Sequence, residues 1–228
     1  MEILQSKLSI SISNIFLSDQ LLCRFYDKVP STHTTLDISD TTTSEVILNV
    51  EKMRSELGIM VLNKEQFLVA KNNINLKELE IFQVEKSPFS IHFHQDHPLA
   101  KKEKIYSQDL FGYTYLHFPY DFYSYINFFN KDQIQCSDFP KTLTCNHHHS
   151  IISLMKGRDT FVKGHLFQAD ELKSAGILTR TIEDITDPVA MVYVKRKREE
   201  LSPNGKLFLE LFANYYASQG PPSASEEF

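Results

Sequence analysis

The chain has 228 residues, 42% of them hydrophobic and 23% charged, which is typical of a globular protein that buries a sizeable core. Its formal net charge of −5 argues against a protein that binds nucleic acid regardless of sequence, because such binding needs a basic face. No apolar run reaches transmembrane length, and no basic stretch followed by an apolar segment begins the chain. We therefore expect a cytoplasmic protein.

The first strand and helix are indicated by their patterns of apolar side chains. Residues 7–13 alternate apolar and polar side chains, as a strand does, and Ser13 or Asn14 can cap a helix that follows. The apolar stripe of this helix consists of Leu17, Leu21, Leu22, Phe25 and Val29. Pro30 ends the helix.

The same order of strand and helix continues to about residue 77. A strand is predicted over residues 34–39, and Thr42 and Glu45 then have the spacing of a capping box. The nearly uninterrupted apolar run over residues 57–62 indicates a strand covered on both faces, with a helix after it. This order implies a parallel sheet with right-handed crossovers.

A second α/β pattern follows two extended stretches over residues 79–84 and 88–93. Its strands are predicted over residues 113–118, 141–144, 161–167, 178–182 and 189–194. Its helices are predicted over residues 120–130, over residues 148–157 with Asn146 or Ser150 as the cap, and after the N-cap and first-turn pair Ser202 and Pro203. We therefore expect two lobes with a cleft between them, and a disordered tail over residues 218–228.

Familiar catalytic motifs are missing. None of the seven glycines forms a G-x-G pattern, which excludes the Rossmann fingerprint, the P-loop and the nucleophile elbow. H-E-x-x-H and C-x-x-C are also absent, and no nucleophile is paired with a base at a defined spacing. We therefore expect a protein that is not an enzyme and that has no cofactor.

Three stretches carry a resemblance to a known family. The first is "DHPLAKKEKI" followed by "SQDLFG" within residues 88–112, the second is "SIISLMKGRDTFVKG", and the third is "VYVKRKREELSPNGKLFLELF". Together they resemble the effector-binding domain of LysR-type transcriptional regulators, and the resemblance covers residues 6–217. The chain departs from the family's pattern at Asp159, where a glycine is usual, and at Gly164, where a proline is common.

This resemblance implies the fold of type-2 periplasmic binding proteins: two Rossmann-like α/β lobes with central mixed sheets, joined by a two-strand hinge. Residues 6–88 would begin the first lobe, residues 89–112 would form the hinge crossing and linker, and residues 113–187 would form the second lobe. Residues 188–217 would return to the first lobe. The family's DNA-binding winged helix-turn-helix lies ahead of the first strand, and we expect it to be absent from this chain.

The resemblance also implies a function. Family members bind a small-molecule effector between the lobes and thereby control the binding of DNA by the attached domain. They form homodimers, which pair into tetramers in full-length proteins, and here helices over residues 41–54 and 148–157 would form the dimer faces. DNA would be contacted only through the missing domain, and no membrane is expected as a partner.

The candidate effector-binding residues follow from the chemistry of strand ends. In open α/β sheets, ligands bind beyond the carboxyl ends of strands, where helix N-termini favour anions. The candidates are Ser13, Asn14, Ile15, Thr41, Thr42 and Thr43 in the first lobe, Ser90 on the crossing strand, and Tyr120, Asp121, Asn146, His147 and His148 in the second lobe. These residues could instead only cap helices, and both roles can hold at once.

The histidines raise metal binding as an alternative. His92 and His94 would share one side of a strand, and residues 147–149 with Cys145 offer a second cluster. Neither supplies a full ligand set at a recognised spacing, and His97 already belongs to the His-Pro-Leu-Ala segment of the resemblance. We therefore expect no metal site. A metal-responsive protein and a solute-binding protein of the same fold remain the alternatives.

Overall fold

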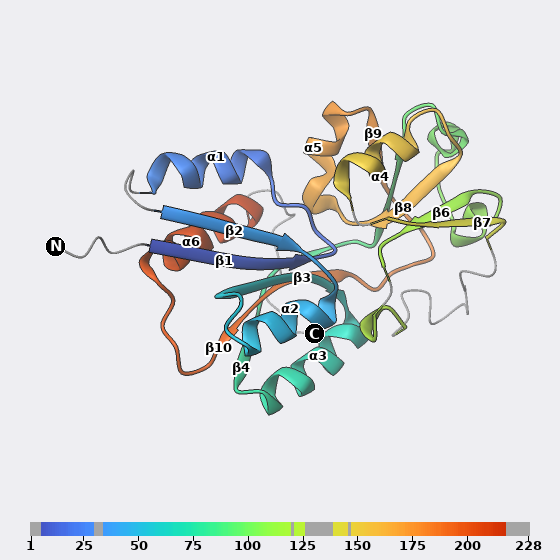
Figure 1. Cartoon of the computed structure of the whole chain (residues 1–228). Helices are drawn as coiled ribbons and strands as arrows, with labels where there is room; N and C mark the ends of the chain where they lie inside the picture. Colours follow the sequence, from blue (N-terminus) through green and yellow to red (C-terminus); the bar gives the residue numbers. More distant parts are fainter. Residues whose placement is uncertain (1–5, 30–33, 120, 126–138, 146, 218–228) are drawn as a thin grey trace. The chain divides into compact units, whose positions relative to one another are not determined.

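The computed structural model describes residues 6–29, 34–119, 121–125, 139–145 and 147–217, and the chain divides into two compact units (Figure 1). Unit 1 comprises Met1–Lys86 and Ala190–Phe228, and unit 2 comprises Ser87–Val189. Each unit has its own five-stranded sheet, so the predicted α/β architecture with two sheets is confirmed. In the described part of the chain, no helix has the length and apolar character needed to cross a membrane.

Unit 1 is built on a sheet with the strand order β2-β1-β3-β10-β4. Its strands are β1 (Ser6–Ser13), β2 (Thr34–Asp40), β3 (Leu57–Asn63), β4 (Leu79–Ser87) and β10 (Val189–Arg196). β1 runs parallel to both β2 and β3, and Ile10 pairs with Ile38 on one side and with Leu57 on the other. The β3 run is buried along its whole length, as its apolar sequence predicts.

The helices of unit 1 are α1 (Asp19–Lys28), α2 (Thr43–Glu51), α3 (Lys64–Leu76) and α6 (Pro203–Ala217). Figure 1 shows α1 on one side of the sheet and α2 and α3 on the other. α1 packs against α6, where the rings of Phe25 and Phe208 meet edge to face at 5.6 Å. α2 lies directly over Gly58, because a Cβ there would lie 2.6 Å from a Val46 methyl group.

A polar cluster explains how the serine-rich strand β1 occupies the interior of this sheet. The Ser11 hydroxyl is fully buried and lies 3.0 Å from that of Ser39 and 2.7 Å from that of Ser55. The side-chain amide of Asn49 on α2 also donates to it, at 3.1 Å. Each buried hydroxyl therefore has a partner, which removes most of the cost of burying it.

The start of α6 is held by a carboxylate from the loop before β3. Glu56 accepts from the Ser202 backbone N–H at 2.6 Å and from the Ser202 hydroxyl at 2.9 Å. The Ser202 hydroxyl in turn accepts from the N–H of Gly205 at 3.0 Å, so Ser202 is the N-cap that the sequence predicts. The negative charge of Glu56 also lies at the positive end of the helix dipole.

We expect Glu56→Gln to lower the free energy of unfolding by about 1–2 kcal/mol, because the amide nitrogen cannot accept from Ser202. Chemical denaturation with urea measures this loss. Glu210→Gln is the matched control, since Glu210 is exposed on the same helix. Equal stability of the two variants would show that the cap bonds contribute nothing.

Unit 2 has a mixed sheet with the strand order β7-β6-β8-β5-β9. Its strands are β5 (Ser90–His94), β6 (Thr114–His117), β7 (Lys141–Thr144), β8 (Thr160–Gly164) and β9 (Ile177–Thr181). β6 runs parallel to β7 and β8, whereas β5 runs antiparallel to β8 and β9. The rings of Tyr115, Phe139 and Phe161 pack together in its core.

The helices of unit 2 are short: α4 (His148–Met155), α5 (Ala169–Ser174) and the 3₁₀-helices η1 (Pro98–Lys101), η2 (Ser107–Leu110), η3 (Tyr123–Tyr125) and η5 (Leu166–Gln168). The His-Pro-Leu-Ala segment forms η1, and the ring of His97 caps it by accepting from the N–H of Leu99 at 3.1 Å. The Asp184 carboxylate accepts from the N–H and the hydroxyl of Ser107 at the start of η2.

Several predicted boundaries are wrong. α1 begins at Asp19 with Ser18 as its N-cap, so neither Ser13 nor Asn14 caps it. Ser150 lies inside α4, whose N-cap is His147. β8 ends at Gly164, because the chain turns into η5 where the strand was predicted to continue.

Three predictions concern residues outside the described part of the chain. Of the helix predicted over residues 120–130, only residues 121–125 are described, with η3 over Tyr123–Tyr125. The proposed cap Asn146 lies outside the described residues, as does the tail over residues 218–228.

Candidate functional site

The ends of β1 and β2 bring three of the predicted residues into contact. The Ser13 hydroxyl lies 3.1 Å from that of Thr43, and the side-chain amide of Asn14 donates to the same Thr43 oxygen at 3.4 Å. The two strands also stay paired to their ends, since the N–H of Thr41 donates to the carbonyl of Ile12 at 2.9 Å. The candidate site of unit 1 is this group of residues.

Asn14 makes the turn that places the site. Its φ of 58° lies in the left-handed region, which asparagine tolerates better than most residues. The chain therefore leaves β1 sharply, and α1 starts five residues later rather than at the strand end. The predicted residue Ile15 is only 1% exposed, so its side chain belongs to the core. Only its backbone is left to contact a ligand.

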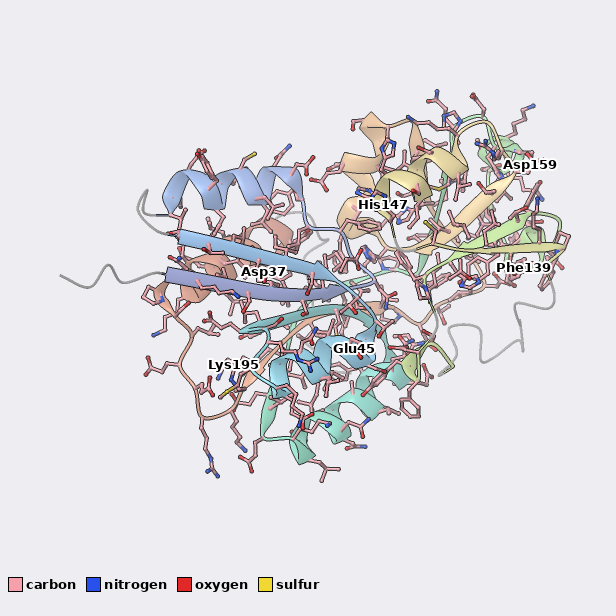
Figure 2. The ribbon with its side chains drawn as sticks, in the orientation of Figure 1. Asp37, Glu45, Phe139, His147, Asp159 and Lys195 are labelled. Carbon is pink, nitrogen blue, oxygen red and sulfur yellow. The ribbon has the colours of Figure 1, made fainter. Side chains whose placement is uncertain are left out.

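The N-terminus of α2 lies at the same strand ends. Thr42 is its N-cap and accepts from the N–H of Glu45 at 3.4 Å, which confirms this half of the predicted capping box. Figure 2 labels Glu45 on this helix. The cap leaves the N–H of Thr43 for another acceptor, because helix ends have more N–H groups than one cap can satisfy. Thr41 and Thr42 are half-buried, as is Asn14, whereas Ser13 and Thr43 are buried.

An acidic residue that was not among the predicted ones comes directly before Thr41 in the chain. Asp40 is the last residue of β2, and its Cα is the partner of Ile12 in the sheet. Its side chain is exposed to solvent, yet enough protein surrounds it for desolvation to raise its pKa to about 6. The sequence signal that could have pointed to it is an acidic residue at a strand end, directly before Thr41.

In unit 2, the predicted residues Ser90, Asp121 and His147 each form a hydrogen bond to a residue two or three positions away in the chain. Ser90 is fully buried in β5, and its hydroxyl donates to the carbonyl of Pro88 at 3.1 Å. The Asp121 carboxylate accepts from both the N–H and the hydroxyl of Ser124, each at 2.9 Å. It therefore stabilises a local turn.

The start of α4 presents two exposed histidines. His147, labelled in Figure 2, lies with Nδ1 3.4 Å from the Ser150 hydroxyl, and His148 is the first residue of the helix. Their neighbouring candidates Tyr120 and Asn146 lie outside the described residues. His147 and His148 remain candidates for supplying positive charge to an anion at this helix end.

The two histidines of β5 form hydrogen bonds with different partners. His92 is buried, and its Nδ1 lies 2.9 Å from the Thr179 hydroxyl. The Nδ1 of His94 accepts from the N–H of Asp96 at 3.3 Å instead. Burial lowers the pKa of His92 to about 3, and the nearby His165 adds to this effect. Across the described ranges, no three His, Cys, Asp or Glu side chains gather as a metal site requires.

Comparisons with known proteins identify the fold. No family model matches the chain, and neither does any curated protein. The effector-binding domain of QuiR, solved in complex with shikimate, matches with a TM-score of 0.64 and 16% identity, covering 94% of this chain and 98% of that one. The regulatory domain of MetR, a LysR family regulator from N. meningitidis, matches with a TM-score of 0.63 and 15% identity, covering 95% and 96%.

A longer protein shows the same likeness. Full-length OxyR from Pseudomonas aeruginosa, solved as a variant, matches with a TM-score of 0.63 and 15% identity, covering 94% of this chain and 70% of that one. The chain therefore has the fold of the effector-binding domains of LysR-family regulators, and the resemblance seen in its sequence is confirmed at the level of the fold.

Proposed function

We propose that this chain, which has the fold of LysR-family effector-binding domains, is a non-enzymatic sensor of a small anionic molecule. The observation that carries the proposal is the contact between Ser13, Asn14 and Thr43 at the carboxyl ends of two parallel strands. Ligands of open α/β sheets bind at such ends. The shikimate-bound structure of the QuiR domain shows that this fold accommodates a small organic ligand.

The chemistry of these residues favours an anion. In the hydrogen bond between the Ser13 and Thr43 hydroxyls only one proton is used, so the other hydroxyl proton is left for a further acceptor. The half-buried residues Asn14, Thr41 and Thr42 add an amide and two hydroxyls, and the α2 dipole adds positive potential. His147 and His148 would add positive charge from the second lobe.

Sensing would proceed by population shift. An effector that contacts both lobes stabilises one arrangement of them, and only its differential affinity for that arrangement can transmit a signal. In the proposed homodimer, whose faces would be the helices over residues 41–54 and 148–157, the altered geometry would control the binding of DNA by an attached domain. This role places the protein in the cytoplasm.

A thermal-shift screen tests the proposal directly. The panel holds shikimate, other small carboxylates, amino acids, sulfate and phosphate, with zinc and a chelator in separate wells. A ligand at a hundredfold excess over its Kd should stabilise the folded chain by about 2.7 kcal/mol. No saturable shift with any anion would contradict the proposal, and a shift with zinc alone, reversed by the chelator, would favour a metal-responsive protein.

Asn14→Asp should weaken binding of the anion found in this screen by about tenfold or more. The two side chains have the same shape and both tolerate a positive φ, so the main change is a negative charge at the site. Isothermal titration calorimetry measures the effect. Asn72→Asp places the same charge on the exposed surface of α3 and should leave the affinity unchanged. Equal affinities for the two variants would place the ligand elsewhere.

A further inference from the structure

The outer side of strand β4 is an edge of the unit 1 sheet. In the strand order of this sheet β4 comes last, beside β10 (Figure 1), and no other strand in the described part of the chain pairs with it. Residues 80–86 contain no proline or glycine that would interrupt pairing with a further strand. The edge of a sheet presents a row of N–H and C=O groups to any strand that can align with it.

Two side-chain contacts show that β4 and β10 run antiparallel. The carboxylate of Glu80 lies 2.9 Å from Nζ of Lys195, which Figure 2 labels. Two residues further along β4, the ring of Phe82 stacks on that of Tyr193, which comes two residues earlier on β10, with ring centroids 4.8 Å apart. All four side chains therefore share one face of the sheet, and Phe82 is 36% exposed there.

The backbone groups that point away from β10 belong to alternate residues. Just before β4, the carbonyl of Glu78 accepts from the N–H of Lys197, just after β10, at 3.0 Å. In an antiparallel pair, residues that bond the neighbouring strand alternate with residues whose N–H and C=O point to the other side. Ile81, Gln83 and Glu85 therefore turn their backbone groups toward the edge, and the Gln83 side chain is exposed.

The centre of β4 is complementary to a second copy of itself. If two β4 strands run antiparallel with their Gln83 residues opposite each other, Glu80 of each copy faces Lys86 of the other. Phe82 of each copy then faces Val84 of the other, on the same face of the joined sheet. Each of these pairs occurs twice, as a two-fold axis between the Gln83 residues requires.

Other alignments lack this match. A slip of one residue would bring Glu80 opposite Glu85 of the second copy, and a parallel pairing in register would set identical charges side by side. The register centred on Gln83 also lets the outward N–H and C=O of Gln83 bond to the same groups of the second copy. Charge and hydrogen bonding therefore favour a single arrangement.

We infer that the edge of β4 is a self-association surface, at which two copies of this chain join their five-stranded unit 1 sheets into one continuous sheet. This surface is separate from the helices over residues 41–54 and 148–157 that would form the homodimer faces. It joins one such homodimer to another. The inference goes beyond the proposed function and does not depend on the ligand site.

Substitutions of Gln83 test the pairing of the backbones. Gln83→Pro removes the outward N–H and places a ring in the path of the second strand, whereas the bonds between β4 and β10 come from other residues. Gln83→Ala keeps the N–H and is the matched control. Sedimentation velocity over a concentration series measures association, and circular dichroism checks folding. We expect Gln83→Pro to halve the mass of the largest species that the original chain forms, and Gln83→Ala to leave it unchanged.

An exchange of charges tests the register. Glu80→Lys and Lys86→Glu each oppose like charges when identical copies pair, so each should weaken this association by about tenfold. In an equal mixture of the two variants, every opposed pair has opposite charges again. The mixture should therefore recover most of the association of the original chain.

Equal masses for Gln83→Pro and Gln83→Ala, both folded, would overturn the inference and leave this edge to a strand from a different protein. A mixture of the charge variants that associates no more tightly than either variant alone would also overturn it. If Gln83→Pro does not fold, the charge variants decide, because both substitutions lie on side chains that are partly exposed to solvent.

Discussion

Gly164→Ala is expected to lower the free energy of unfolding by about 3 kcal/mol, one of the largest losses available to a single methyl group in this chain. A Cβ at this position would lie 1.9 Å from Nε2 of His92, far inside contact distance. The His92 ring cannot easily move, because it is buried, bound to Thr179 and packed edge to face with His165 at 6.3 Å. The added methyl group must therefore displace the β5–β8 pair.

Urea denaturation measures the loss, and hydrogen exchange at the amides of β5 and β8 locates it in unit 2. Gly112→Ala is the matched control, because a Cβ there meets nothing within 4 Å. Adding His92→Ala to Gly164→Ala should recover part of the stability by removing the obstructing ring. A Gly164→Ala variant as stable as Gly112→Ala would show that the ring moves aside at little cost.

Unit 2 should lose stability as the pH falls from 7 to 5. Burial lowers the pKa of His92 from its ordinary value of 6.5 to about 3, so the unfolded chain binds a proton more readily than the folded one. The stabilisation is fully present above pH 6.5 and is lost as the pH falls toward 3. His92 alone should account for about 2 kcal/mol between pH 7 and pH 5. The pKa values of His97 and His117 are also lowered by burial, which adds to the trend.

Hydrogen exchange of the unit 2 strands, measured at several pH values and corrected for intrinsic exchange rates, checks this prediction. His92→Gln should flatten the dependence, whereas His149→Gln, on an exposed residue of α4, should leave it unchanged. Asp40 titrates with the opposite sign, because its raised pKa lets the folded chain bind the proton first, so its contribution to stability grows as the pH falls below about 6. It also lies in unit 1, outside the strands that are measured. A pH dependence in His92→Gln as steep as in the original chain would contradict the prediction.

The sequence predicted the elements whose signals are local. The apolar run of β3, the cap at Thr42 and the Ser202–Pro203 start of α6 all depend on residues within one turn or strand, and the structure confirms them. The resemblance then implied that the sheets of the two lobes are mixed, which periodicity alone does not determine.

Other features depend on residues far apart in the chain. The fit between Gly164 and His92 arises because Ser90 pairs with Gly164 in an antiparallel register, and no local pattern reveals that register. The start of α1 was misplaced because the cap signals of Ser13 and Asn14 resemble those of Ser18, and only the positive φ of Asn14 separates them. Asp40 was overlooked because a single acid at a strand end is common, and the surrounding protein that raises its pKa is visible only in three dimensions.

The buried hydroxyls around Ser11 have a consequence for how β1 finds its place. Side chains on a strand alternate between faces, so a slip of one residue would carry Ser11 away from Asn49 and Ser55 and bring an isoleucine into the polar cluster. A strand of uniform isoleucine and valine would be indifferent to such a slip. The serines of β1 would thus act against mispairing during folding. They would fix the register of the strand whose end carries Ser13 and Asn14 of the candidate site.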